Sequence, residues 1–157
     1  MKRRSLVAGN WKMHNTGPDA AALAADLRRR IEAFCDFRDV VVCPPSTSLT
    51  AVREALKESA ISLGAQNMHW EEAGAFTGEV SAPMLLTSGC THVIIGHSER
   101  RQLFGDTDAA VNRKLGAALH SGLTPLVCIG ETLAEREAGR TEAVVLGQLR
   151  AAVKEIP

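Results

Sequence analysis

Short apolar runs alternate with amphipathic segments along almost all of the 157 residues. Most of the runs are followed by apolar residues spaced three or four apart, which is typical of a helix with one buried face. The runs predict strands at 5–8, 39–43, 61–65, 92–95 and 124–129. Because parallel strands need helical crossovers, this alternation predicts a parallel sheet covered by helices. Both an open doubly wound sheet and part of a closed barrel fit it.

Apolar faces and capping residues mark the helices between these strands. The longest helix is predicted over 19–34, where Ala20 and Phe34 share one face. Thr107 is placed to cap a helix, and residues 132–135 have the spacing of a capping box. Other helices are predicted at 49–56 and 82–88, and from about Thr141. We find no linker and no second domain.

The unusual polar residues lie just after the predicted strands, where parallel α/β proteins bind ligands. They include Asn10, Lys12, Gln66 and His97. Residues 66–79 also form a connection longer than most, and such loops often carry function.

Charge and hydropathy exclude several classes of protein. The 18 basic and 18 acidic residues give a net charge of zero, so neither a nucleic acid nor a membrane is expected as a partner. No apolar run approaches the roughly 20 residues of a transmembrane helix. We therefore expect a cytoplasmic protein. The fingerprints of dinucleotide and nucleoside-triphosphate sites are also missing.

Neither the cysteines nor the histidines predict a metal site. The four cysteines have no zinc or disulfide spacing, so we expect reduced, mostly buried thiols. His92 and His97 are five residues apart across a strand end, which directs strand side chains to opposite faces. No metal is therefore expected between them.

His97 stands between an apolar strand and a short helix that begins with Ser98. Backbone N–H groups at a helix start would donate to one imidazole nitrogen and favour a neutral ring with its proton on the other. Such a ring could polarise a substrate carbonyl, although a histidine can also simply close a strand. Lys12 could hold an anion or be solvated, and Glu99 could pair with it.

Five motifs, in order along the chain, resemble those of the triosephosphate isomerase family. They are GNWKM at 9–13, GAQN at 64–67, GAFTGE at 74–79, IGHSERR at 95–101 and CIGET at 128–132. The resemblance implies a TIM (β/α)₈ barrel. It also implies a cofactor-independent aldose–ketose isomerase that interconverts dihydroxyacetone phosphate and glyceraldehyde 3-phosphate through an enediolate, in glycolysis and gluconeogenesis.

The resemblance also implies a role for each residue of the site. Lys12 would bind the substrate and stabilise negative charge, and His97 would be the neutral electrophile. Asn10 would help to hold the substrate, and Glu99 would position Lys12. The supporting residues would be Ser98, Glu99, Cys128 and Glu131. In a homodimer, the subunit contact would include His14, Phe76 and Thr77. His14 departs from the family, which usually has Asn at that position.

The length of the chain limits these expectations. A (β/α)₈ barrel usually needs about 250 residues, so residues 1–157 are expected to form one partial domain with about the first five βα units. The family places its catalytic glutamate and lid beyond Pro157, and neither Glu131 nor Glu142 stands in the required motif. We therefore expect the isolated chain to be inactive. Two alternatives remain, an inactive amino-terminal piece with a structural role and an open doubly wound binding module.

Overall fold

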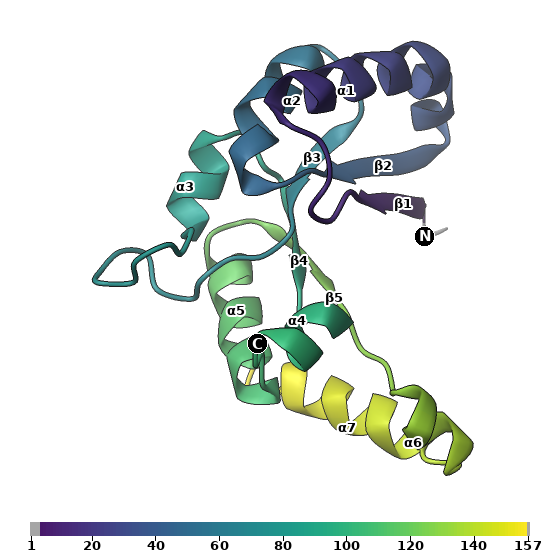
Figure 1. Cartoon of the computed structure of the whole chain (residues 1–157), viewed down its shortest axis with the longest axis vertical. Helices are drawn as coiled ribbons and strands as arrows, with labels where there is room; N and C mark the ends of the chain where they lie inside the picture. The colour runs from purple at the N-terminus through teal and green to yellow at the C-terminus, as the bar shows by residue number, and fades with distance from the viewer. Residues whose placement is uncertain (1–3, 157) are drawn as a thin grey trace.

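The computed structural model describes residues 4–156, so the expected domain limits at 1 and 157 lie outside it. Its five strands are β1 (Ser5–Asn10), β2 (Arg38–Cys43), β3 (Ser62–Ala65), β4 (His92–Ile95) and β5 (Thr124–Val127). All neighbouring strands are parallel, and their order in the sheet is their order in the chain. A doubly wound sheet reverses its order at a switch point. That alternative is therefore wrong, and the sheet curls into half of a barrel (Figure 1).

Seven α-helices are described along with the strands. They are α1 (Gly17–Ile31), α2 (Leu49–Ala55), α3 (Ala82–Thr87), α4 (Ser98–Leu103), α5 (Asp108–His120), α6 (Leu133–Glu137) and α7 (Thr141–Ala152). Figure 1 shows α1 and α2 together over the first strands, and α5 beside β4 and β5. Two short 3₁₀ turns, Glu32–Asp36 and Ser46–Ser48, complete the described helical segments.

The larger apolar core lies between the sheet and its helices. Alternate residues of a strand face opposite sides of the sheet, so Val93 and Ile95 of β4 point to the helices. They are completely buried with Val52 of α2 and Val111 of α5. This core fixes the strand ends, and therefore the positions of the polar residues that follow them.

A smaller apolar cluster fills the concave side of the sheet. Val41, Cys43 and Ile94 are buried there, with Cys128 partly buried against them. Gly64 faces the same side, because a Cβ atom at this position would lie 2.7 Å from Sγ of Cys43. Glycine therefore allows the strands to approach closely at this point.

The described sheet has two open edges, at β1 and β5. Leu6 and Val7 of β1 are 43% and 54% exposed, although strand residues of this kind are normally covered. Within residues 4–156 the two edge strands are not joined, so the barrel is not closed.

The sequence predicted which helices and strands form more accurately than it predicted where each of them ends. Thr107 accepts a hydrogen bond from the Ala110 N–H, and residues 132–135 form the expected capping box. The helix predicted over 19–34 ends earlier, at Ile31, and Phe34 is 55% exposed. Glu32 explains the difference, because its carboxylate turns away to accept hydrogen bonds from the segment before β3. The strand predicted to end at residue 129 ends at Val127.

Candidate active site

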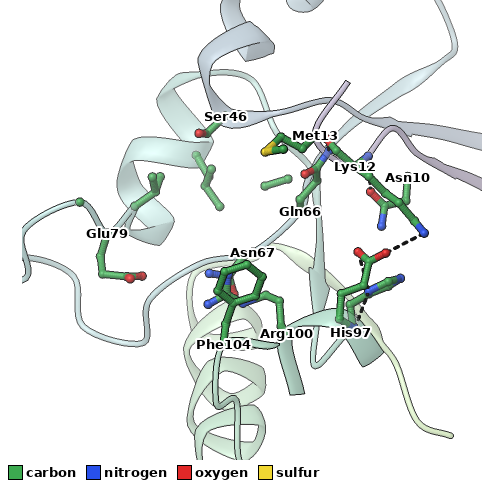
Figure 2. Close-up of a pocket in the computed structure, with 15 residues that line it drawn as sticks. Asn10, Lys12, Met13, Ser46, Gln66, Asn67, Glu79, His97, Arg100 and Phe104 are labelled. Carbon is green, nitrogen blue, oxygen red and sulfur yellow. Dashed lines mark hydrogen bonds and ion pairs between the residues drawn. The ribbon is translucent and has the colours of Figure 1, made fainter. Parts of the chain in front are cut away.

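Polar residues from the carboxyl ends of β1, β3 and β4 surround a hollow of about 330 Å³. Figure 2 shows Asn10 and Lys12 on one side of this hollow, His97 below them and Glu79 at the far end. The sequence placed all but Glu79 at strand ends, and the structure brings them together as that placement predicted.

Lys12 is held in an uncommon backbone conformation. Its φ angle is +53°, in the left-handed region that costs a residue with a side chain about 1–3 kcal/mol. Two local hydrogen bonds support this turn. The Lys12 N–H donates to Oδ1 of Asn10 at 2.9 Å, and the Trp11 N–H donates to the Cys43 carbonyl at 3.0 Å. Asn10 therefore shapes the loop that carries Lys12.

Gln66 fastens this loop from the other side. Its side-chain amide donates to the carbonyl oxygens of Lys12 and Cys43, both at 2.8 Å. One amide thus joins the loop after β1 and the end of β2 to the loop that follows β3. The sequence marked Gln66 as unusual, but nothing in the spacing indicated these two acceptors.

Lys12 and Glu99 form an ion pair in the lining of the hollow. The ammonium lies 2.8 Å from Oε1 of Glu99, which confirms the pairing considered from the sequence. The hydrogen bond from Lys12 is the main cause that holds the pKa of Glu99 below its usual value, and the Lys12 charge adds to it. Lys12 therefore favours the charged form of the Glu99 carboxylate, and a carboxylate with a lowered pKa is a weak base.

His97 caps the first turn of α4 with its ring. Nδ1 accepts a hydrogen bond from the Glu99 N–H at 3.2 Å, so in the neutral ring the proton resides on Nε2. This is the arrangement predicted from the helix start. Gly96, with a φ angle of +70°, makes the sharp turn that precedes the ring. Lys12 and Nε2 of His97 are then two donors able to stabilise an oxygen that becomes negative.

A buried ionic cluster next to the hollow was missed by the sequence analysis. Lys114 bonds to Asp106 and Asn67, and Arg100 also bonds to Asp106. Burial raises the pKa of Asp106, but the hydrogen bonds and charges of the two cations outweigh it and lower the pKa overall. A signal was present, because Lys114 stands three residues after Val111 on the apolar face of α5.

The other residues expected to support the site, Ser98, Cys128 and Glu131, lie at different distances from it. Ser98 begins α4 and is exposed. Cys128 is partly buried on the concave side of the sheet, where burial raises the pKa of its thiol. Glu131 lies outside the residues that line the hollow and pairs with Arg136 at 2.7 Å.

The long connection between β3 and α3 projects from the body of the molecule (Figure 1). Phe76 folds back within it, with its ring 4.3 Å from that of His69. Gly74 permits this, because a Cβ atom there would lie 2.7 Å from the Phe76 ring. Thr77 is exposed beside this anchored turn, and His14, on the loop after β1, is exposed too.

Residues 4–156 contain no group of three or more His, Cys, Asp and Glu side chains that could hold a metal ion. His92 sits on β4, where burial lowers the pKa of its ring, and Thr91 is its hydrogen-bond partner. All four cysteines are free thiols. Three of them are buried as expected, and Cys128 is only partly buried. A membrane-spanning helix would need a longer and more apolar stretch than any helix between residues 4 and 156 contains.

Three comparisons with known proteins all find relatives of the same family. The model of the triosephosphate isomerase family matches residues 5–157. Curated triosephosphate isomerases of Chloroflexus aurantiacus and Moorella thermoacetica are 54% and 56% identical over 99% and 97% of this chain. The crystal structure of triosephosphate isomerase from Bartonella henselae superposes with a TM-score of 0.88 at 38% identity, over 99% of this chain.

This chain is shorter than those relatives. It spans 62% and 60% of the two curated proteins and 64% of the solved one. Its five parallel strands therefore correspond to part of the solved structure.

Proposed function

The chain belongs to the triosephosphate isomerase family, and we propose that it supplies the lysine–histidine half of an isomerase site. In the complete protein, that site interconverts dihydroxyacetone phosphate and glyceraldehyde 3-phosphate. The observation that carries this proposal is the geometry of two donors. The Lys12 ammonium and the Nε2 proton of His97 border one hollow, and each is oriented by Glu99.

This geometry suits a reaction that passes through an enediolate. When a base removes a proton from the carbon beside the carbonyl, the electron pair of that C–H bond moves towards the carbonyl oxygen. His97 would donate a hydrogen bond to this oxygen as its negative charge grows, and Lys12 would stabilise it electrostatically. Lys12 would also attract the anionic substrate, and Asn10 would keep the lysine loop in shape. The reaction needs no cofactor.

The base itself has no candidate in the described hollow. Glu79 and Glu99 are the carboxylates that line it. Glu99 is bound to Lys12, and its lowered pKa makes it a weak acceptor of a proton from carbon. Glu79 belongs to the projecting loop and stands at the far end of the hollow (Figure 2). We therefore propose that the base comes from a part of the complete protein outside these residues, as the family resemblance implies.

Residues that line the same hollow support the proposal of a homodimer. Met13 and Phe104, which line it, are 93% and 67% exposed, and apolar side chains this exposed are common at protein interfaces. A loop shaped like the one that carries Phe76 and Thr77 could cover them. We propose that the loop of a second copy fills the hollow beside Lys12, with His14 close to the contact.

A second role is supported by one observation. The edge strands β1 and β5 leave the sheet open within residues 4–156, so this segment could act as a structural or interaction unit without activity. We propose a single partial barrel domain for the whole chain in either case. For the complete protein we propose a cytoplasmic enzyme of glycolysis and gluconeogenesis, with no nucleic-acid or membrane partner.

An isomerase assay on the complete protein tests the principal proposal. Dihydroxyacetone phosphate should be converted, and Lys12→Met and His97→Gln should each lower kcat by roughly a hundredfold to a thousandfold, as for a lost oxyanion donor. Lys57→Met is the matched control, because Lys57 is an exposed lysine just after α2, outside the hollow. Wild-type kcat/KM in both site variants would contradict the proposal.

A further inference from the structure

Lys114 is almost completely buried, and the proposed mechanism does not use it. Its side chain is 4% exposed, and the side chain of its partner Asp106 is 8% exposed. Lysine is rarely buried to this degree unless its charge is paired. A buried ion pair can often be replaced by apolar residues of similar volume without loss of stability. Stability alone therefore does not account for this lysine.

All three N–H groups of the Lys114 ammonium have acceptors. Nζ lies 2.9 Å from Oδ1 of Asn67 and 3.0 and 2.9 Å from the two carboxylate oxygens of Asp106. Asp106 also accepts a hydrogen bond from Nε of Arg100 at 3.1 Å. Lys114 of α5 thus joins the loop after β3 to the loop after α4.

Both connections lead to Lys12 through adjoining residues. Asn67 follows Gln66, whose amide holds the backbone carbonyl of Lys12. Arg100 follows Glu99, which pairs with the Lys12 ammonium. Figure 2 shows Asn67 and Arg100 at the edge of the hollow, below Lys12 and beside His97. Lys114 therefore connects, through Asn67 and Asp106, to the neighbours of the two residues that hold Lys12, which are Gln66 and Glu99.

We propose that Lys114 is a positioning residue for Lys12. By binding Oδ1 of Asn67 it fixes the segment after β3, so that the adjoining Gln66 keeps its grip on the Lys12 carbonyl. The left-handed backbone of Lys12 is strained and needs this restraint. The consequence for catalysis rests on the function proposed above, whereas the consequence for the Lys12 backbone does not.

Two variants of the complete protein test this role. Asn67→Ala removes the link and leaves the buried Lys114–Asp106 pair intact, and Lys114→Met removes the ammonium at similar length. Each should lower kcat/KM by roughly tenfold or more, because a small displacement of a catalytic group is costly. Each should also speed hydrogen exchange at the Lys12 amide, which donates to Asn10.

Val52→Ala is the matched control for lost stability, because Val52 lies in the core between sheet and helices. It should lower the melting temperature and leave both kcat/KM and exchange at Lys12 unchanged. A merely structural role for Lys114 would give this same pattern in its own variant and would overturn the proposal. If Lys114→Met does not fold, Asn67→Ala decides alone.

The double variant Asn67→Ala/Lys114→Met tests the route. If Lys114 acts through Asn67, the double variant loses no more kcat/KM than Lys114→Met alone. Multiplied losses would contradict that route. If the wild-type protein fails to isomerise its substrate, the proposed function is wrong, and the exchange rate of the Lys12 amide still decides this inference. A wild-type rate of hydrogen exchange at the Lys12 amide in Asn67→Ala would overturn the positioning role of Lys114.

Discussion

The Lys12 ammonium lies 2.8 Å from Oε1 of Glu99, although the two side chains are 51% and 44% exposed. Ion pairs this open to water contribute little to stability, typically about 0–1 kcal/mol. The value of this pair therefore lies in where it holds the lysine. The backbone N–H of the same glutamate also orients the ring of His97, so Glu99 links the two donors of the site.

Glu99→Gln in the complete protein should separate placement from stability. The neutral amide keeps the size of the side chain and removes the charge that holds Lys12. We expect kcat/KM to fall by about tenfold, because a small displacement of a catalytic group is costly, while the melting temperature barely changes. Enzyme kinetics and calorimetry measure the two effects. Unchanged kinetics with a large loss of stability would contradict this role.

The ring of His97 should carry its proton on Nε2. The hydrogen bond from the Glu99 N–H to Nδ1 leaves only Nε2 to be protonated in the neutral ring. Nitrogen-15 chemical shifts of the imidazole, assigned with the His97→Gln variant, report the tautomer. A neutral ring with its proton on Nδ1 would show that the cap of α4 is not formed in solution.

Part of this site could be predicted from the sequence, for a definite physical reason. His97 follows an apolar strand, and residues at strand ends of a parallel sheet have to meet at one edge. The Lys12–Glu99 pair and the capped ring follow from that local order. The bonds from Gln66 and Lys114 do not, because they join residues 54 and 47 positions apart in the chain. Such contacts depend on how the elements pack.

The fold, too, could be predicted from the sequence only in part. Short apolar runs located every strand, and the order of the strands followed only from their observed pairing. Phe34 was misassigned to the buried face of α1 because its apolar spacing continues past Ile31, where α1 gives way to a 3₁₀ turn. The bonds of Glu32 to Ser59 and Ala60, which turn the chain away, are tertiary. Local patterns therefore predict the elements and leave their ends to packing.

Deletion of residues 75–78 should prevent dimer formation. This removes Phe76 and Thr77 from the projecting loop, and with them the surface proposed to cover Met13 and Phe104 in a second copy. We expect monomers with strongly reduced activity, measured by sedimentation velocity and kinetics. Phe37→Ala is the control, because Phe37 is 75% exposed and lies outside the hollow. An unchanged dimer after the deletion would assign the contact elsewhere.

Two thiols should be unreactive in the native protein. Burial raises the pKa of Cys43 to about 12 and that of Cys90 to about 11. Since the thiolate is the reactive form, neither should be alkylated near pH 8 before unfolding. Mass spectrometry of alkylated peptides, with denatured protein as the control, measures this. Rapid native labelling of Cys43 would contradict the packing of the concave face.

We propose that these residues supply the lysine and the histidine of the site and that the base comes from elsewhere in the complete protein. The most direct measurement is isomerase activity of residues 1–157 alone, then after addition of the remaining carboxyl-terminal segment in trans. We predict no activity before the addition, because proton abstraction from carbon needs a positioned base. We predict activity that depends on Lys12 and His97 once the segment is bound. Full activity of residues 1–157 by themselves would show that the base lies within these residues.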